Sequence, residues 1–199
     1  MTPADYLAPY LPSRLVPAGT ATAYAPANIA LAKYWGKRDR VLNLPVNGSL
    51  SISLGSHGSR TTVGAAEADS ITLNGVRAAA DSALHRRTFA FIEHLRRGAP
   101  QPLAITSENT IPTAAGLASS ASGFAALTLA LNAYWRLNLP GAVLSALARI
   151  GSGSAARSLW HGFVKWDKGE QPDGSDSIAT LIASDWQELR IALVEIDSG

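Results

Sequence analysis

Residues 107–121, SENTIPTAAGLASSA, have the composition of a phosphate-binding loop. Gly116 and the small residues 118–121 leave backbone N–H groups free at the start of a predicted helix, where the helix dipole favours an anion. A serine-rich N-cap with close helix packing is the alternative interpretation and needs no ligand. The length of the motif favours phosphate binding.

A second glycine-rich segment, GSGSAAR at residues 151–157, places two hydroxyl groups ahead of a cation. The guanidinium of Arg157 can hold a carboxylate or a phosphate through two parallel hydrogen bonds. Alternatively, Arg157 only pairs with an internal acid such as Asp176. Taken with the first loop, this segment indicates a ligand that carries two anionic groups.

The third candidate segment is NIALAKYWGKR, at residues 28–38. Lys33 and Lys37 are four residues apart, so in a helical turn they would share a face and could contact a further phosphate. Surface lysines at this spacing are usually only solvated. Tyr34 and Trp35 fit either a core or the wall of a pocket.

Composition limits the remaining possibilities. The chain has 199 residues, of which 47% are hydrophobic and 16% charged, values typical of one globular domain. Its 17 basic and 15 acidic residues argue against a broad nucleic-acid-binding surface. With no cysteine, the chain has no disulfide, no thiolate metal site and no thiol nucleophile, and its four histidines lack metal-ligand spacing. We expect a cytoplasmic protein, because the sequence shows neither a signal peptide nor an apolar run of the roughly 20 residues that cross a bilayer.

Alternating strands and helices are predicted to position these segments. Residues 1–19 contain four prolines and are expected to form an irregular arm. Asn74 and Gly75 predict a tight hairpin turn, and Asp81 is the predicted N-cap of the first helix. Strands are predicted over residues 20–25, 50–54, 60–63, 70–73, 103–106, 162–166 and 190–196, and helices over 81–97, 117–135 and 141–149.

Several blocks of the sequence, in this order, resemble the diphosphomevalonate decarboxylase family. The blocks are APANIA (25–30), KYWGKRD (33–39), LNLPVN (42–47), PTAAGLASSA (112–121), GSGSAAR (151–157) and DGSDS (173–177). This family belongs to the GHMP kinase superfamily, and the KYWGK block is typical of its decarboxylase branch. The resemblance runs from about Thr20 to the end of the chain.

The resemblance implies an α+β fold, the GHMP-kinase-type N-terminal lobe. Such a lobe has a mixed β-sheet packed against helices and a left-handed βαβ phosphate-binding unit. It would comprise residues 20–199, and we expect the second, C-terminal lobe of the family to be absent. That lobe supplies the family's catalytic aspartate in a motif of the type Asp-Ala-Gly-Pro-Asn, which does not occur in this sequence.

The implied activity is that of a lyase of isoprenoid biosynthesis in the mevalonate pathway. The family uses ATP and Mg²⁺ to phosphorylate the 3-hydroxyl of mevalonate 5-diphosphate, and loss of phosphate and CO₂ then yields isopentenyl diphosphate. Family members are often homodimers, and none is expected to need nucleic acid or a membrane.

Site residues carry over by position in the matching blocks. The ATP-binding residues would be Pro112, Gly116, Leu117, Ala118, Ser119 and Ser120, with Ser119 and Ser120 also near Mg²⁺. The substrate diphosphate would contact Tyr34, Lys37, Ser152 and Ser154. Arg157 would hold the substrate carboxylate, and Lys33 would lie near the reacting hydroxyl, which makes these two the expected catalytic residues.

Three positions depart from the family pattern without removing a charged contact: Gly48 where serine is frequent, Ser122 where alanine is common, and Ala156 where cysteine is common. Two other functions stay open from sequence. One is a relative that only phosphorylates, or that acts on mevalonate phosphates with fewer phosphoryl groups. The other is a non-catalytic chain that binds nucleotide or isoprenoid precursors and needs a partner lobe.

Overall fold

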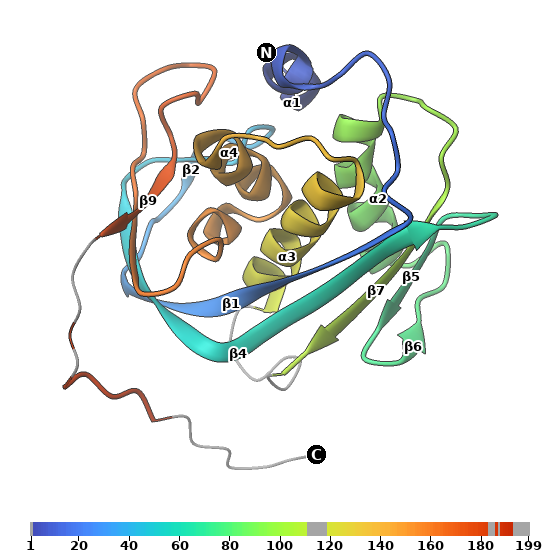
Figure 1. The fold of residues 1–199 in the computed structure, drawn as a ribbon. Coiled ribbons are helices and arrows are strands. Elements are labelled where there is room, and N and C mark those ends of the chain that lie inside the picture. Colours follow the sequence, from blue (N-terminus) through green and yellow to red (C-terminus); the bar gives the residue numbers. More distant parts are fainter. Residues whose placement is uncertain (1, 111–118, 183–185, 187, 193–199) are drawn as a thin grey trace.

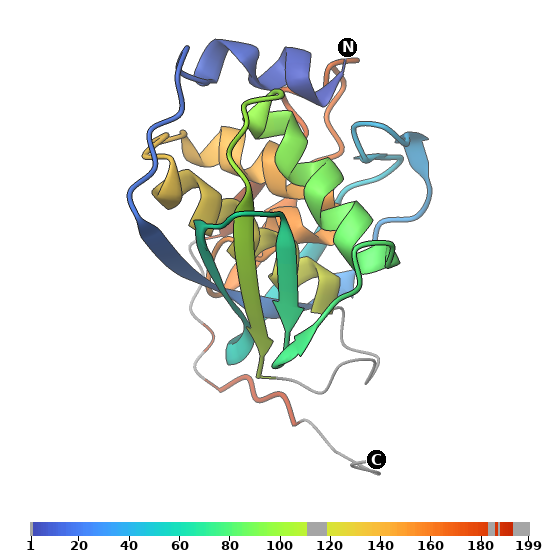
Figure 2. The same ribbon diagram turned by 90° about the vertical axis from the view of Figure 1, so that its right-hand side faces the viewer.

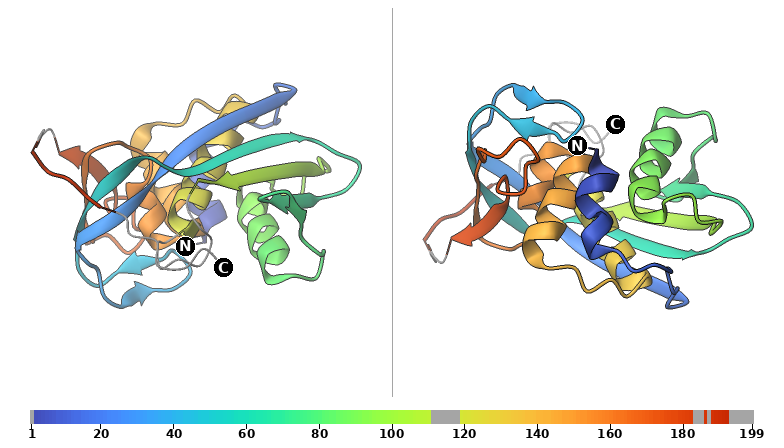
Figure 3. Two further views of the ribbon diagram at one scale, coloured as in Figure 1. Left: turned by 90° about the horizontal axis from the view of Figure 1, so that it is seen from below. Right: turned by 90° about the horizontal axis from the view of Figure 1, so that it is seen from above.

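The computed structural model describes residues 2–110, 119–182, 186 and 188–192. A seven-stranded mixed sheet carries the helices on one face (Figure 1). Seen from below in Figure 3, the sheet lies in front of the helices, and seen from above the helices lie in front of the sheet. The predicted α+β class, a mixed sheet packed against helices, is confirmed.

The sheet has the strand order β6-β5-β7-β4-β8-β9, with β1 paired to β4, and β2 and β3 form a separate hairpin. The pairing of β5 with β7 is parallel, and the other pairings are antiparallel. Figure 2 shows the β5–β6 hairpin beside β7. The strands are β1 (Thr20–Ala32), β2 (Lys37–Asp39), β3 (Leu44–Pro45), β4 (Ser49–Ala65), β5 (Ser70–Leu73), β6 (Val76–Arg77), β7 (Leu103–Asn109), β8 (Phe163–Trp166) and β9 (Ala179–Ile182).

Strands β1 and β4 are longer than predicted, and β4 joins two predicted strands into one. Pro26 and the glycines at 55 and 58 resemble strand breakers in the sequence, but the strands bend there instead of ending. The register of the pair shifts after Pro26, and Gly55 has a φ of +61°. At Gly58 a Cβ atom would lie 2.2 Å from the carbonyl oxygen of Ala25, so only glycine allows the two strands this approach.

The three predicted helices are confirmed as α2 (Ala83–Arg96), α3 (Ser119–Tyr134) and α4 (Gly141–Gly151). The N-cap of α2 is Ser82 and not the predicted Asp81, because the Ser82 hydroxyl accepts the backbone N–H of His85 at 3.2 Å. Arg97 ends the helix in the left-handed conformation, and Gly98 follows with a φ of +76°.

The arm over residues 1–19 is not wholly irregular, contrary to the prediction. It contains α1 (Pro3–Leu7), which Thr2 begins with a capping box, and a 3₁₀ turn at Ala8–Tyr10. Proline is well tolerated at the first helical position because its missing N–H would be unpaired there in any case. In the predicted strand over residues 190–196 the described residues, 190–192, are not in a strand, and β9 was not predicted.

The core lies between the sheet and the helices. Val63 of β4 and Ile105 of β7 pack in one cluster with Leu131 of α3 and Leu147 of α4, all at most 2% exposed. A smaller cluster surrounds Trp166 of β8 and includes Ala156, Val164 and Ala179. This second cluster lies next to the segment at 151–157 and forms the packed base of the candidate site.

Candidate functional site

The N-terminal turn of α3 meets the C-terminal end of α4. Ser152 caps α4, and its hydroxyl oxygen lies 3.4 Å from that of Ser120 in α3. The predicted nucleotide segment and the predicted substrate segment are therefore neighbours. Among the predicted ATP-binding residues, Pro112, Gly116, Leu117 and Ala118 lie outside the described residues, as does the side chain of Ser119.

A buried chain of hydrogen bonds fixes the start of α3. The Ser122 and Ser59 hydroxyl oxygens are 2.8 Å apart, and the Ser59 hydroxyl also donates to the side-chain oxygen of Asn109 at 2.7 Å. These residues belong to α3, β4 and β7. Ser122 and Ser59 are fully buried, so this chain ties the helix to the sheet one turn from Ser119.

Arg157 is buried, with 2% of its surface exposed, and its described hydrogen-bond partners are uncharged. Its guanidinium donates to the hydroxyls of Ser51 at 3.0 Å and Ser49 at 2.5 Å and to the side-chain oxygen of Asn28 at 3.3 Å. The alternative pairing with Asp176 is not found among the described residues, where that carboxylate accepts backbone N–H groups of its own loop.

Burial lowers the pKa of Arg157 to about 10, and the nearby Tyr34 partly opposes this shift. The guanidinium therefore stays charged at neutral pH. A buried charge with only neutral partners is energetically unfavourable, and an anionic ligand would compensate it. The site around Arg157 thus has the electrostatics of a carboxylate or phosphate site.

Tyr34 lies beside the segment at 151–157. Its ring contacts Trp166 edge to face, with ring centroids 4.9 Å apart. Its hydroxyl oxygen would lie only 2.6 Å from a Cβ atom on Gly153. Asn28 joins the same group, because its amide donates to the Ser154 carbonyl at 3.2 Å and to the Ser158 hydroxyl at 2.7 Å.

Lys33 and Lys37 do not share a helical face, contrary to the prediction. Lys33 follows β1 and Lys37 begins β2, and the residues between them are in neither a helix nor a strand. The side chain of Asn47 orders this turn by accepting the N–H of Trp35 at 2.8 Å and donating to the Lys33 carbonyl at 3.1 Å. Both lysines are exposed, which leaves their charges accessible to a ligand.

Two cavities adjoin the junction of α3 and α4. The first, of about 270 Å³, lies among α2, α3, β5 and β7, and its lining is mostly apolar but includes Asn109 and Ser120. The second, of about 320 Å³, has Lys37, Asn43, His94 and Gly151 in its lining.

Arg87 of α2 lines both cavities and was missed in the sequence analysis. It donates to the Gly151 carbonyl at 2.9 Å, and its guanidinium carbon lies 4.8 Å from the centroid of the Phe124 ring. The helical pattern of α2 assigns Arg87 to a polar face. Arg87 is exposed, and its spacing of four from Phe91, which also lines the second cavity, is the sequence signal that both residues lie on one face of the helix.

In residues 2–110, 119–182, 186 and 188–192, no group of three or more His, Cys, Asp and Glu side chains is placed to hold a metal ion. Across the same ranges, no helix has the length and apolar character needed to cross a membrane.

Comparison with known proteins gives a consistent family. Residues 25–179 match the family model described as the diphosphomevalonate decarboxylase-like N-terminal domain. The diphosphomevalonate decarboxylase of Gibberella zeae is 46% identical over 198 residues, which cover 90% of this chain and 52% of that protein. The chain spans about half the length of the curated relatives it matches.

Solved structures give the same result. The crystal structure of mevalonate diphosphate decarboxylase from Staphylococcus aureus superimposes with a TM-score of 0.77 at 38% identity, over 84% of this chain and 51% of that one. A protein designated MDDEF, in complex with MVAPP, AMPPCP and magnesium, gives a TM-score of 0.72 at 40% identity, over 82% of this chain and 50% of that one.

Proposed function

Because this chain belongs to the diphosphomevalonate decarboxylase-like family, we propose that it is the ATP- and substrate-binding lobe of an ATP-dependent mevalonate 5-diphosphate decarboxylase. The proposed reaction phosphorylates the 3-hydroxyl and then releases phosphate and CO₂ to form isopentenyl diphosphate. Its support is the family membership together with one observation in the fold, the burial of Arg157 against hydrogen-bond partners that are all uncharged among the described residues.

Arg157 is proposed to hold the substrate carboxylate. Its guanidinium already has its orientation set by Ser49, Ser51 and Asn28, so little conformational freedom would be lost on binding. A carboxylate would replace neutral acceptors with a charge-assisted pair, which is about twice as strong as a neutral hydrogen bond. The same contact would fix the geometry of the carboxyl group that is to leave as CO₂.

The diphosphate of the substrate is proposed to lie between Tyr34, Lys37, Ser152 and Ser154. The exposed ammonium of Lys37 and the position of Ser152 beside Ser120 support this assignment. Four such contacts favour a diphosphate over a substrate with fewer phosphoryl groups, because each unmatched polar group lowers affinity.

ATP is proposed to bind at the start of α3. Its phosphates would contact Pro112, Gly116, Leu117, Ala118, Ser119 and Ser120. The largely apolar cavity next to Ser120 offers a place for the base. ATP and Mg²⁺ binding fits the complex of the MDDEF protein with AMPPCP and magnesium.

The residues present fit Mg²⁺ that arrives with ATP. The hydroxyls of Ser120 and Ser152 lie 3.4 Å apart at the helix start, and Mg²⁺ needs few protein ligands when phosphate oxygens supply the rest. We assign Ser119 and Ser120 as its protein contacts. When bound, the ion neutralises charge on the phosphates during transfer.

Lys33 is proposed to act at the reacting 3-hydroxyl. Its ammonium would stabilise the negative charge that gathers on the transferred and then departing phosphate. The order that Asn47 imposes on the backbone between residues 33 and 35 supports a defined position for this cation. A cytoplasmic location and a homodimer complete the proposal by family resemblance.

The test is calorimetric titration of the chain with mevalonate 5-diphosphate and with Mg-ATP. We expect Arg157→Gln to weaken binding of mevalonate 5-diphosphate about 10- to 100-fold, the loss of one charge-assisted contact, and to leave Mg-ATP binding unchanged. Arg77→Gln, at an exposed position in β6, is the matched control and should change neither affinity. Equal binding of mevalonate 5-diphosphate by wild type and Arg157→Gln would refute the assignment of Arg157.

A further inference from the structure

We infer that Asn43 is a positioning residue that holds the ammonium of Lys37 in place against the end of α4. The inference rests on the proposed function, in which Lys37 binds a phosphate of the substrate. Asn43 lies in the turn between β2 and β3, at the wall of the second cavity.

The side chain of Asn43 is bonded at both ends of its amide. Its nitrogen donates to the carbonyls of Arg149 at 3.0 Å and Ile150 at 2.8 Å. Its oxygen accepts from the ammonium of Lys37 at 2.6 Å. Carbonyls in the last turn of a helix lack partners within the helix, so the end of α4 offers two acceptors in a fixed geometry. Because both amide hydrogens are used there, the amide oxygen is left on the opposite side, where it accepts from Lys37.

The backbone around Asn43 is held by the same turn of α4. Arg149 is fully buried, and its Nε donates to the carbonyl of Leu42 at 3.0 Å. Asn43 itself has a φ of +53°, a left-handed conformation that asparagine tolerates better than most residues. The Arg149 side chain of the helix therefore donates to the hairpin backbone, and the Asn43 side chain of the hairpin donates to the helix backbone.

A neutral partner suits a lysine that must keep its charge for a ligand. The ammonium of lysine ends a flexible chain of four carbons, and ordering it on binding would cost conformational entropy. Asn43 restricts the ammonium in advance without neutralising it, and two of the three ammonium donors remain for phosphate oxygens. The lining of the second cavity contains Lys37, Arg87 and His94 but no acidic residue of the described chain.

The end of α4 thereby links the two parts of the proposed diphosphate site, Lys37 on one side and the segment with Ser152 and Ser154 on the other. Residues 149 and 150 hold Asn43 and, through it, Lys37. Ser152, two residues later, begins the segment that carries Ser154 and Arg157. Loss of the Asn43 side chain would let the Lys37 ammonium move away from this segment, although Asn43 itself is not proposed to touch the substrate.

The experiment is a double-mutant cycle between Asn43 and Lys37, with mevalonate 5-diphosphate as the titrated ligand. Asn43→Gly keeps the left-handed backbone and removes the amide, and we expect it to weaken binding about tenfold. In a Lys37→Ala chain, the same change should have no further effect. Asn138→Gly is the matched control, because Asn138 is also left-handed, with a φ of +51°, and lies outside the proposed site.

If Asn43→Gly does not fold, Asn43→Asp takes its place with the same expected loss, because a carboxylate would neutralise Lys37 and could not donate to α4. Wild-type affinity in Asn43→Gly, with weakened binding in Lys37→Ala, would overturn this inference alone. An equal tenfold loss in the Lys37→Ala chain would also overturn it, since Asn43 would then act on the fold and not on Lys37. A wild-type chain that binds no mevalonate 5-diphosphate would overturn the proposed function together with this inference.

Discussion

The glycines at residues 151 and 153 allow close packing as well as backbone access. A Cβ atom on Gly151 would lie 2.3 Å from the ring of Phe124, and one on Gly153 would lie 2.6 Å from the hydroxyl oxygen of Tyr34. The GSGS motif therefore brings α3 and the Tyr34 side chain against the segment that ends in Arg157. This packing is independent of whether the motif also faces a phosphate.

Gly153→Ala should displace the hydroxyl of Tyr34 and destabilise the chain. Tyr34 has little room to move, since its ring packs on Trp166, and overpacking of this kind costs about 1–3 kcal/mol. Urea unfolding would measure the loss. Gly64→Ala in β4 is the control, because its nearest described neighbour would be 3.7 Å from the new Cβ, and there we expect less than about 0.5 kcal/mol. Equal stabilities for the two variants would contradict the argument.

Sequence analysis could predict the residues of the proposed site that lie in short motifs but not the partners that hold them. Ser120 and Ser152 were predicted from loop composition, and the structure brings them together. The acceptors of Arg157 on β1 and β4 lie more than 100 residues away in sequence, and only the strand pairing places them under the guanidinium. Asn43 and Arg87 were missed for the same reason, since their partners are carbonyls at the end of α4.

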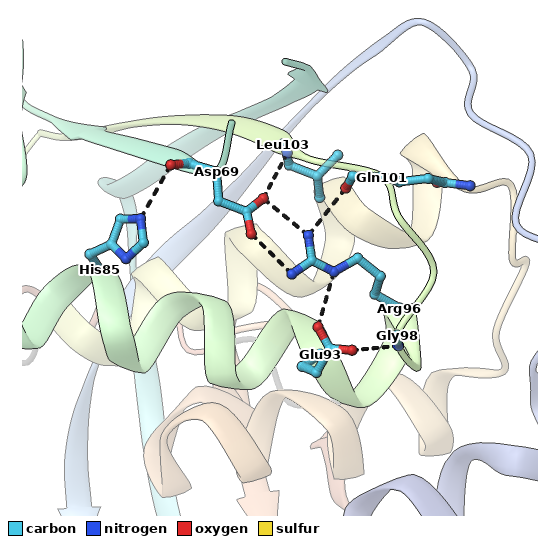
Figure 4. Close-up of polar contacts among 7 residues, drawn as sticks. All are labelled: Asp69, His85, Glu93, Arg96, Gly98, Gln101 and Leu103. Atoms are coloured by element: carbon cyan, nitrogen blue, oxygen red, sulfur yellow. Dashed lines mark hydrogen bonds and ion pairs between the residues drawn. The ribbon is translucent and has the colours of Figure 1, made fainter. Parts of the chain in front are cut away.

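At the scale of elements, a polar clamp at the C-terminal end of α2 fixes the helix to the sheet (Figure 4). The guanidinium of Arg96 donates to both carboxylate oxygens of Asp69 at 3.0 Å and to Glu93 at 3.0 Å. Asp69 lies just before β5 and also accepts the N–H of Leu103, the first residue of β7, at 2.9 Å. The clamp therefore sets α2 relative to β5 and β7, two of the strands that line the first cavity.

Asp69→Asn should lower the free energy of unfolding by about 1–3 kcal/mol, because it breaks a two-pronged pair whose side chains are only 26% and 12% exposed. Chemical denaturation would measure this, and a cycle with Arg96→Gln would isolate the pair. Lys168→Gln, which breaks the exposed pair with Glu170, is the control, and its change should stay within about 0.5 kcal/mol. If Asp69→Asn and Lys168→Gln lower the free energy of unfolding equally, the clamp does not stabilise the fold more than an exposed ion pair does.

Element types followed from periodicity, whereas element lengths depended on tertiary pairing. The helices α2, α3 and α4 have apolar residues at helical spacing, and each was predicted within a few residues. Strand β1 was predicted to end at Ala25 but continues to Ala32, because β4 pairs with it beyond the bulge at Pro26. The β2–β3 hairpin has five strand residues in total, too few for an alternating pattern.

Across the whole molecule, the proposed site gathers at the end of the sheet where α3 begins and α4 ends. Two buried arginines lie there, Arg149 and Arg157, and the described hydrogen-bond acceptors of both are neutral. Burial lowers the pKa of each to about 10. The fold thus keeps two desolvated positive charges at this end of the sheet, and for Arg157 the proposed substrate carboxylate would offset the cost of burial.

The acid stability of the whole chain should depend in part on His94. Burial lowers its pKa below the ordinary value of about 6.5, and Glu93 partly opposes the shift. Between these two pKa values the unfolded chain binds more protons than the folded chain, so the free energy of unfolding falls as pH falls through about 6.5. Urea unfolding at several pH values between 7.5 and 5 would measure this slope, to which one group contributes at most about 1.4 kcal/mol per pH unit.

His94→Gln removes the titrating group, and we expect its stability to decline less steeply than that of wild type over this range. Glutamine keeps a polar side chain of similar length, so the comparison isolates the proton and not the packing. His57→Gln, at an exposed position on β4, is the matched control and should follow the wild-type profile. Groups that titrate elsewhere in the molecule contribute equally to all three chains and cancel in the differences. Parallel profiles for wild type and His94→Gln would show that protonation of His94 is not linked to folding.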